Sequence, residues 1–177
     1  MEDSSILRRR STRKFEDRPV EKEKIERILR AAMQAPSAKN TQSWEFLVVT
    51  DRAACEAIAK VSPYTVCAAE APAILLPLAN LQRDDPQTPW WVQNLSAATE
   101  NLLLQAEEEG LGAVWLGVYP LPERVRTVRE LFALPDHIMP FAAVPIGYKL
   151  REKPFADRYD PEKVHWEHYG RNRPENR

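Results

Sequence analysis

Apolar residues recur at helical spacing soon after the first twenty residues, and charged residues lie between them. These apolar positions are Ile25, Ile28, Leu29, Ala32 and Met33. They predict an amphipathic helix that ends at Pro36 and Ser37. Residues 44–50 include β-branched and aromatic side chains and predict a buried strand. Asp51 can then cap a second helix that reaches about position 61.

The middle of the chain contains the most apolar helix. Residues 71–79 predict a strand, in which Pro77 indicates a strand end or a sheet edge. Residues 90–110 predict a long helix that ends at Gly110. Its expected inner face consists of Val92, Leu95, Thr99, Leu102, Leu103 and Ala106. Because more than half of its surface is apolar, we expect either full burial within the domain or a place in a homodimer interface.

The remaining pattern predicts a strand over residues 113–118, a helix started by proline over 121–132 and a last core strand over 141–148. From Arg151 onward the chain is highly charged and has no clear period. About four strands are visible, and neither an internal repeat nor a linker divides the chain. We therefore expect one domain over residues 1–177, of which 151–177 form a C-terminal extension.

Composition narrows the class of protein. The chain has 177 residues and a formal net charge of −1, so it lacks the global basic field that gathers nucleic acid. No apolar run approaches the roughly 20 residues needed to cross a bilayer, and the first residues do not form a secretory signal. Cys55 and Cys67 have no metal or redox spacing. These features are typical of a soluble, cytoplasmic protein without a membrane partner.

Several common kinds of active site are not predicted. The segment "GLGAVW" lacks the third glycine of a dinucleotide fingerprint, and no glycine-rich loop precedes a GKS or GKT sequence. His137, His165 and His168 do not form a metal-binding set. No Ser-His-Asp or Cys-His arrangement follows from the spacings. We therefore expect no metal and no side-chain nucleophile.

Two polar segments remain. In "RRRSTRKF", Arg9, Arg10, Ser11 and Arg13 offer guanidinium groups and a hydroxyl that suit a phosphate monoester, although such a run can also be a solvated face or a mobile tail. In "APSAKNTQSWEF", Ser37, Asn40, Thr41 and Gln42 suit the edge of a heterocycle. The same residues could instead form a turn that caps the preceding helix.

The order of these motifs resembles that of the FMN-dependent nitroreductase family. An Arg-Arg-Ser-x-Arg cluster, one helix and a Pro-Ser-x-x-Asn-x-Gln-x-Trp segment are followed by "SAATENLLLQAEEEGLGAVWLG", "PIGY" and "DRYDPEKVHWE". The resemblance covers nearly the whole chain. It implies an α+β, three-layer α-β-α fold with a mixed, mainly antiparallel central sheet. It also implies an intertwined homodimer with FMN at the interface and the C-terminal extension wrapped around the partner.

The resemblance also implies roles for individual residues. Arg9, Arg10, Ser11 and Arg13 would hold the FMN phosphate and ribityl chain, and Arg158 would be a second phosphate contact. Pro36, Ser37, Ala38 and Asn40 would approach the flavin from the other subunit, with Gln42 nearby. Leu116, Gly117 and Val118 would face the isoalloxazine ring, and one of their amides would donate to its N5. No side chain would act as an acid or base.

The implied activity is oxidoreduction. Hydride would pass from NADH or NADPH through flavin N5 to a nitroaromatic, quinone or similar acceptor in a ping-pong cycle. Alternatives with the same fold are enzymes that destroy flavin or remove halogen from aromatic rings. An alternative of another class is a non-catalytic module that binds a phosphate ligand or nucleic acid.

The chain departs from the family pattern at four positions. Ser43 replaces a proline, Asn94 an acid and Ala156 a basic residue, for which Lys153 is a candidate substitute. Lys39 lies in the segment that would border the open side of the flavin, so we expect it to face substrate and to favour anionic substrates or the phosphates of the nicotinamide cofactor. The short chain also predicts an open pocket with a small lid.

Overall fold

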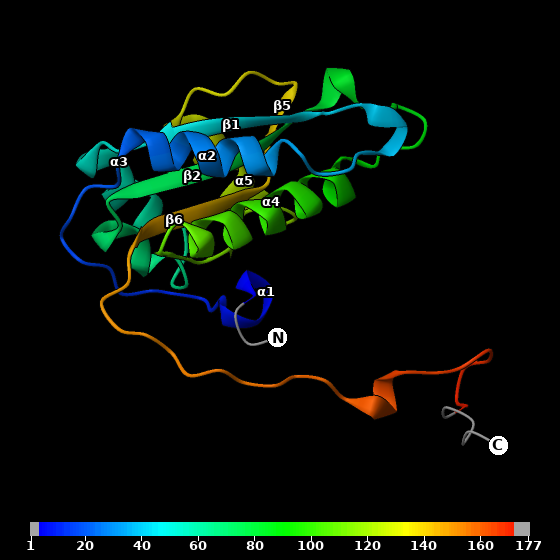
Figure 1. Cartoon of the computed structure of the whole chain (residues 1–177). Helices are drawn as coiled ribbons and strands as arrows, with labels where there is room; N and C mark the ends of the chain where they lie inside the picture. Colours follow the sequence, from blue (N-terminus) through cyan, green and yellow to red (C-terminus); the bar gives the residue numbers. More distant parts are fainter. Residues whose placement is uncertain (1–3, 172–177) are drawn as a thin grey trace.

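The computed structural model describes residues 4–171 and has three layers, with one sheet between two groups of helices (Figure 1). The helices are α1 (Ser5–Arg8), α2 (Lys22–Ala32), α3 (Arg52–Ala59), α4 (Trp91–Glu108) and α5 (Pro122–Leu131). The strands are β1 (Trp44–Val49), β2 (Ala73–Asn80), β3 (Leu111–Ala113), β4 (Leu116–Gly117), β5 (Ile138–Pro140) and β6 (Ala142–Tyr148). Short 3-10 turns span Ala38–Asn40, Val66–Glu70, Leu81–Arg83 and Pro161–Lys163.

The sheet has the order β1-β2-β6-β3, with β4 paired to β6 and β5 paired to β2. All of these pairs are antiparallel. A parallel bridge also joins Ser11 to Ala113, at the edge strand β3. The predicted α+β class with a mainly antiparallel central sheet is therefore confirmed.

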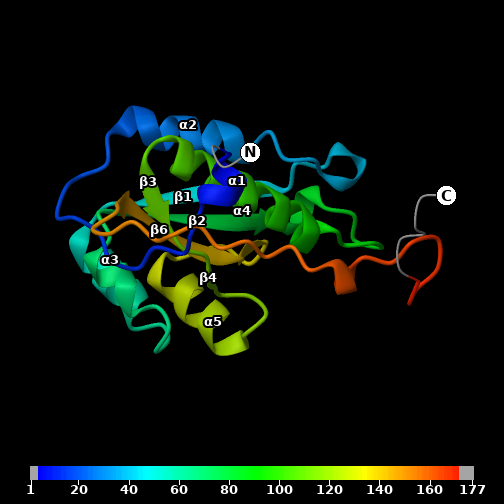
Figure 2. The same ribbon diagram turned by 60° about the horizontal axis from the view of Figure 1, so that its bottom comes forward.

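Each face of the sheet is covered by helices, as Figure 2 shows: α2 and α4 lie on one side, and α3 and α5 lie on the other. Alternate residues of β2 point to opposite faces. Leu75 packs into the core under α2 and α4 with Ile28 and Leu102, whereas Ile74 packs with Ile58 of α3 on the other side. Burial on both faces explains why β2 is apolar from Ala73 to Ala79.

Pro77 was predicted to mark a strand end or a sheet edge, and this was wrong. Pro77 lies inside β2, which is buried along its whole length between neighbouring strands. Strand β6 pairs with residues 73–75 and β5 with 78–80, so Pro77 lies between the two pairings. Its carbonyl accepts the N–H of Phe141 at 3.0 Å on that side. The backbone nitrogen of an extended residue points to the same side as its carbonyl. On that side Pro77 lies between the two strand pairings, so its missing N–H removes no hydrogen bond from either pairing.

The single strand predicted over residues 113–118 is instead two short strands, β3 and β4, that share one register against β6. The interruption at Val114 and Trp115 lies opposite Pro145, which has no N–H to donate. Pairing with β6 resumes at Leu116 in β4. Helix α1 and strand β5 were not predicted, because four and three residues are too short to show a period.

The predicted inner face of α4 is mostly correct. Leu95, Thr99 and Leu102 are fully buried, whereas Val92 is only partly covered. Asn94 and Glu107 are buried as well, so the buried face of α4 is wider than the apolar pattern indicated. Burial within the chain itself accounts for the apolar character of this helix.

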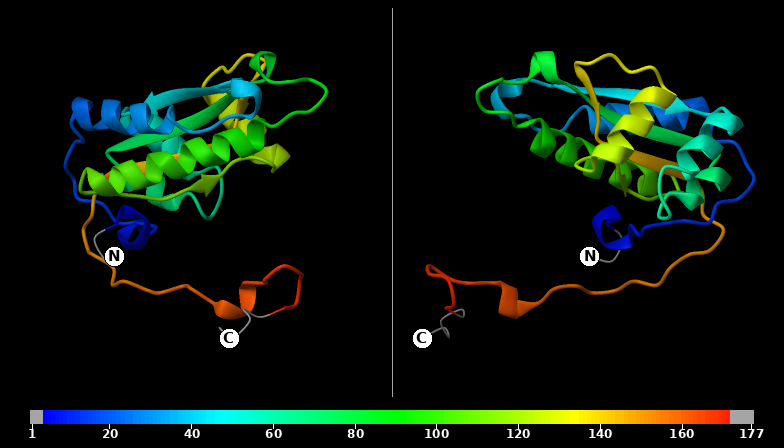
Figure 3. Two further views of the ribbon diagram at one scale, coloured as in Figure 1. Left: turned by 45° about the vertical axis from the view of Figure 1, so that its right-hand side comes forward. Right: turned by 180° about the vertical axis from the view of Figure 1, so that it is seen from behind.

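The C-terminal segment leaves the layered core after β6 and extends away from it, as both views of Figure 3 show. Between 151 and 171 the side chains are exposed except at Asp160 and Val164, which are partly covered. Residues 172–177 of the expected extension lie outside the described residues. Within residues 4–171, none of the helices has the length and apolar character that crossing a membrane requires.

Candidate functional site

The basic N-terminal segment is fastened to the edge of the sheet. The backbone N–H of Thr12 donates to the carbonyl of Ala113 at 2.9 Å, and the Thr12 side chain is buried. The Thr12 side chain packs against Gly112, and a Cβ added to Gly112 would come within 2.6 Å of it. A glycine at this point therefore allows the two backbones to approach closely. The result is a fixed position for the arginines on either side of Thr12.

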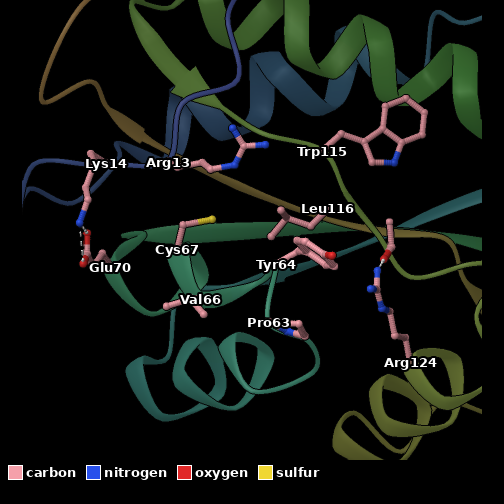
Figure 4. A pocket seen from close by; sticks show the side chains of 11 residues that line it. Arg13, Lys14, Pro63, Tyr64, Val66, Cys67, Glu70, Trp115, Leu116 and Arg124 are labelled. Carbon is pink, nitrogen blue, oxygen red and sulfur yellow. Dashed lines mark hydrogen bonds and ion pairs between the residues drawn. The ribbon is translucent and has the colours of Figure 1, made fainter.

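A pocket of about 600 Å³ opens beside this segment (Figure 4). Its wall combines the N-terminal segment, the turn before β2, the break between β3 and β4, and α5. The lining residues are Arg13, Lys14, Pro63, Tyr64, Val66, Cys67, Glu70, Trp115, Leu116, Gly117 and Arg124. A volume of this size is in the usual range for a small-molecule site.

The charges of this pocket are unbalanced. Arg13 has no hydrogen-bond or ion-pair partner among residues 4–171. Lys14 pairs with Glu70 at 3.4 Å, and Arg124 donates from Nη1 to the carbonyl of Gly117 at 2.8 Å. Three cations thus face one carboxylate, and this set suits an anionic ligand. Burial raises the pKa of the Cys67 thiol, so this group is a neutral part of the wall at neutral pH.

The backbone of Gly117, at the end of β4, lies at the wall of this pocket. An added Cβ on Gly117 would meet only the carbonyl of Tyr119, at 3.9 Å. The packing of the chain therefore does not require glycine here, but a ligand that approaches the backbone closely would. Val118 is buried, and its N–H already donates to the carbonyl of Phe141 at 3.1 Å. Leu116 and Gly117 line the pocket, whereas Val118 does not.

Arg9 and Arg10 make contacts within the chain. Arg9 Nε lies 3.6 Å from Glu100 Oε1 on α4. Arg10 Nη1 donates to the carbonyls of Leu7 and Arg9, both at 2.7 Å, and its Nε donates to Pro154 at 3.2 Å. Arg10 Nη2 is buried and has no partner within the described chain. The Arg10 side chain thus caps carbonyls at the C-terminal end of α1 and binds the start of the C-terminal segment. Its Nη2 remains as an unused donor among residues 4–171.

Two other predicted phosphate contacts lie on the C-terminal segment. Lys153 Nζ donates to the carbonyl of Ser11 at 2.8 Å, so its ammonium group lies next to the basic cluster. Ala156 and Arg158 are exposed, and Arg158 has no hydrogen-bond or ion-pair partner among the described residues. Of the candidates on this segment, Lys153 is the one that the fold brings to Ser11 in a single chain.

The second polar segment forms a tight turn between α2 and β1. Lys39, Asn40 and Gln42 all have positive φ angles, of 53°, 53° and 46°. Asparagine adopts this left-handed conformation readily, but lysine and glutamine do so rarely. Hydrogen bonds hold the turn, from Gln42 N–H to Ser37 Oγ at 3.1 Å and from Gln42 Nε2 to Asn40 Oδ1 at 2.9 Å. Backbone strain of this kind is typical of functional segments.

The turn is also tied to the rest of the chain. Asn94 of α4 accepts the N–H of Ala38 at 3.0 Å and donates to Thr41 Oγ1 at 3.2 Å. Lys39 forms an ion pair and a hydrogen bond with Asp85. The hydrogen bond from Lys39 lowers the pKa of Asp85. Ser43 is fully buried, and its carbonyl accepts the N–H of Asn80 at 2.7 Å.

The predicted residues do not all meet within one chain. Arg13, Leu116 and Gly117 meet at the pocket, whereas residues 36–42 contribute nothing to its wall. The prediction missed Tyr64 and Arg124, which also line the pocket. A signal for Arg124 was present in the sequence, because a cation in the first turn of a helix opposes the helix dipole.

Comparison with known proteins agrees with this fold. The family model described as the nitroreductase family matches residues 6–66 and 62–148. The chain belongs to the nitroreductase family. A relative from Methanothermobacter thermautotrophicus, provisionally named NADH dehydrogenase/NAD(P)H nitroreductase, is 42% identical over 92% of this chain and 85% of its own length.

Solved structures of other nitroreductase-like proteins superpose closely. A provisionally named NADH oxidase from Clostridium acetobutylicum is 43% identical with a TM-score of 0.90, covering 94% of this chain and 100% of its own. A provisionally named nitroreductase from Desulfovibrio desulfuricans, solved in complex with FMN, is 30% identical with a TM-score of 0.79, covering 93% and 95%. This nitroreductase chain thus shares its fold with a protein that binds FMN.

Proposed function

We propose that this nitroreductase-family chain is an FMN-dependent oxidoreductase that uses NADH or NADPH to reduce a nitroaromatic, quinone or similar acceptor. The observation that carries the proposal is the pocket that the unpaired Arg13 lines together with Leu116 and the open backbone of Gly117. A cationic wall suits a phosphate-bearing cofactor, and a backbone without a side chain suits the flat face of a ring. The FMN complex of the Desulfovibrio relative supports the same ligand.

The chain's own residues would bind and orient the cofactor. Ser11 and Arg13 would hold the phosphate and ribityl chain together with Arg9, and the spare Nη2 of Arg10 is a further donor. The chemistry that FMN supplies when bound is the transfer of hydride from NAD(P)H to the acceptor, in alternate steps of a ping-pong cycle. No residue in the pocket is required as a general acid or base.

A second copy of the chain would complete the site. Residues 36–42 lie away from the pocket of their own chain but keep a strained conformation that buried contacts hold in place. The extended C-terminal segment with Arg158 covers little of its own core. We infer a homodimer in which Pro36, Ser37, Ala38, Asn40 and Gln42 reach the flavin of the partner and residues 151–177 wrap around it.

An absorption spectrum of the purified protein tests the proposal. We expect a yellow protein, or one that becomes yellow on addition of FMN, and we expect NADH or NADPH to bleach it without oxygen. Nucleotide oxidation with defined acceptors then separates nitroreduction or quinone reduction from flavin destruction and dehalogenation. A colourless protein that binds no added FMN would contradict the proposal and leave an anion-binding module as the alternative.

As a sharper test, Arg9→Ala should weaken FMN binding by roughly tenfold to a hundredfold, the equivalent of one charge-assisted hydrogen bond. The fold should survive, because the partner of Arg9 in the chain is the half-exposed Glu100. Equal dissociation constants for FMN in the wild type and the variant would remove Arg9 from the site.

A further inference from the structure

Arg124 lies in the first turn of α5, where the helix dipole is unfavourable for a cation. It is the third residue of α5, which begins at Pro122, and no side chain caps this helix. The N-terminal end of a helix carries partial positive charge, so a cation in the first turn is unfavourable. Arg126, two residues later, is exposed and pairs with Glu123 on the same helix. Arg124 has no such local partner, so its position needs a tertiary explanation.

That explanation is a contact with the strand end. Arg124 Nη1 donates to the carbonyl of Gly117 at 2.8 Å, and the guanidinium carbon lies 5.8 Å from the centre of the Tyr64 ring. Figure 4 shows Arg124 reaching into the pocket wall from α5, opposite the segment that carries Arg13. The other guanidinium donors have no hydrogen-bond partner among residues 4–171.

The contact fixes one peptide group at both ends. Arg124 binds the carbonyl of Gly117, and the N–H of the same peptide, on Val118, donates to Phe141 at 3.1 Å. Because a peptide group is planar, fixing both polar ends sets its orientation. The Cα of Gly117 lies in this plane and is therefore held in place at the pocket wall.

We propose that Arg124 is a positioning residue of the flavin site that also favours the reduced cofactor over the oxidised one. The inference rests on the proposed function. Hydride transfer from NAD(P)H to the flavin adds two electrons and one proton, so the ring gains one negative charge. Arginine remains cationic at all accessible pH values, and charge close to the ring changes the electronic properties of the cofactor.

Four variants separate charge from position. Arg124→Lys keeps the charge and one donor, Arg124→Gln keeps a donor without charge, and Arg124→Met keeps neither. Arg126→Gln is the matched control, because it removes an exposed cation from the same helix. For each variant we would measure the dissociation constant of oxidised FMN by titrating apoprotein, the midpoint potential by equilibration with a reference dye, and the thermal midpoint.

We expect Arg124→Gln and Arg124→Met to weaken binding of reduced FMN about tenfold more than binding of oxidised FMN, which lowers the two-electron midpoint potential by about 30 mV. Arg124→Met should weaken oxidised FMN further, since the carbonyl of Gly117 loses its donor. Arg124→Lys should stay close to the wild type, and Arg126→Gln should not differ from it.

Unchanged midpoint potentials in the Gln and Met variants, with FMN still bound, would overturn the inference and leave the proposed function intact. A fall in thermal midpoint and FMN affinity without a change in potential would likewise overturn it, because the role would then be structural only. A wild-type protein that binds no FMN would instead overturn the proposed function, and the inference would fail with it.

Discussion

Asn94, buried in the first turn of α4, binds the backbone of Ala38. Its Oδ1 accepts the Ala38 N–H at 3.0 Å, and its Nδ2 donates to Thr41 at 3.2 Å. Asn94 is buried on α4, whereas the turn that it holds contains left-handed residues such as Lys39 and Asn40. A residue of the core helix thus sets the conformation of a strained surface turn.

We predict that Asn94→Leu will destabilise this turn. The free energy of unfolding should fall by about 1–3 kcal/mol, because the partly buried N–H of Ala38 loses its acceptor. If the turn faces the partner's flavin, the dissociation constant of FMN should also rise, by about tenfold. Asn94→Asp keeps an acceptor for Ala38 and should have a smaller effect on both. Urea denaturation and FMN titration measure the two quantities.

The control for Asn94 lies on the same helix. Asn101 donates from Nδ2 to the carbonyl of Ala31 at 3.2 Å, away from the turn. Asn101→Leu should reduce stability without affecting FMN binding. If both leucine variants bind FMN equally well, Asn94 supports the fold but not the site.

Two glycines should respond in opposite ways to an added methyl group. In Gly112→Ala the new Cβ would lie 2.6 Å from Thr12, and this overpacking should cost about 1–3 kcal/mol of stability. In Gly117→Ala it would meet only the carbonyl of Tyr119 at 3.9 Å, an ordinary contact, so stability should change by less than about 0.5 kcal/mol. FMN affinity should nevertheless fall in Gly117→Ala, by about tenfold. A Gly117→Ala protein that binds FMN as tightly as the wild type would place the ring elsewhere.

Lys39 should have a modest effect on substrate choice, because Asp85 already pairs with it. Lys39→Ala should raise KM for an anionic acceptor such as 4-nitrobenzoate, by at most about fivefold for an exposed charge. Asp85→Asn should lower the same KM, since it frees the ammonium group while keeping an oxygen for the N–H of Gln87.

The neutral 4-nitrobenzamide is the control acceptor for both variants, and its KM should not change. NADH and NADPH should be compared in the same assays. If Lys39→Ala left the Michaelis constants for both nucleotides and for the anionic acceptor unchanged, Lys39 would have no role in selecting charge.

Lys149 and Glu107 form an ion pair at 2.9 Å with little exposure of either side chain. Burial alone would lower the pKa of Lys149, but hydrogen bonds to Glu107 and Glu152 more than offset this, and the pKa is raised. A raised pKa means that the pair stabilises the fold below the pKa of about 10.4 in the unfolded chain and loses this effect as the pH rises through the folded value.

Lys149→Met should therefore lower the free energy of unfolding by roughly 3 kcal/mol, because Glu107 keeps a buried charge without its main partner. The loss should be constant between about pH 6 and 9 and should disappear only in strong alkali. Adding Glu107→Gln should recover most of it. A loss that grew as the pH rose through neutrality would contradict this assignment.

If the chain forms the proposed homodimer, removing residues 151–177 should abolish it and leave the core folded, because most side chains of this segment are exposed in the single chain. Sedimentation velocity measures the first effect, and the thermal midpoint measures the second. Arg10 would lose its contact with Pro154 but keep those with Leu7 and Arg9. A truncated protein that remained dimeric would show that the extension does not hold the subunits together.

Much of the secondary structure followed from periodicity. The apolar spacing around Ile28 and Leu102 predicted α2 and α4, because an amphipathic helix must bury its apolar side in any fold. The run at residues 44–50 likewise predicted β1. The prolines were harder to interpret, since the cost of a missing N–H depends on which neighbour faces it. On one side Pro77 lies between the pairings of β2 with β6 and with β5, and Pro145 lies opposite the break between β3 and β4; only strand register shows this.

The sequence by itself determined the family resemblance, the basic cluster and the polar turn, because residue types and their order are local properties of the chain. Only the tertiary structure decided which of them meet. Pairing of Thr12 with Ala113 brings Arg13 to the break before β4, and α5 delivers Arg124 to the carbonyl of Gly117. These contacts join segments far apart in sequence, and such contacts depend on the register of the sheet and the packing of helices on it.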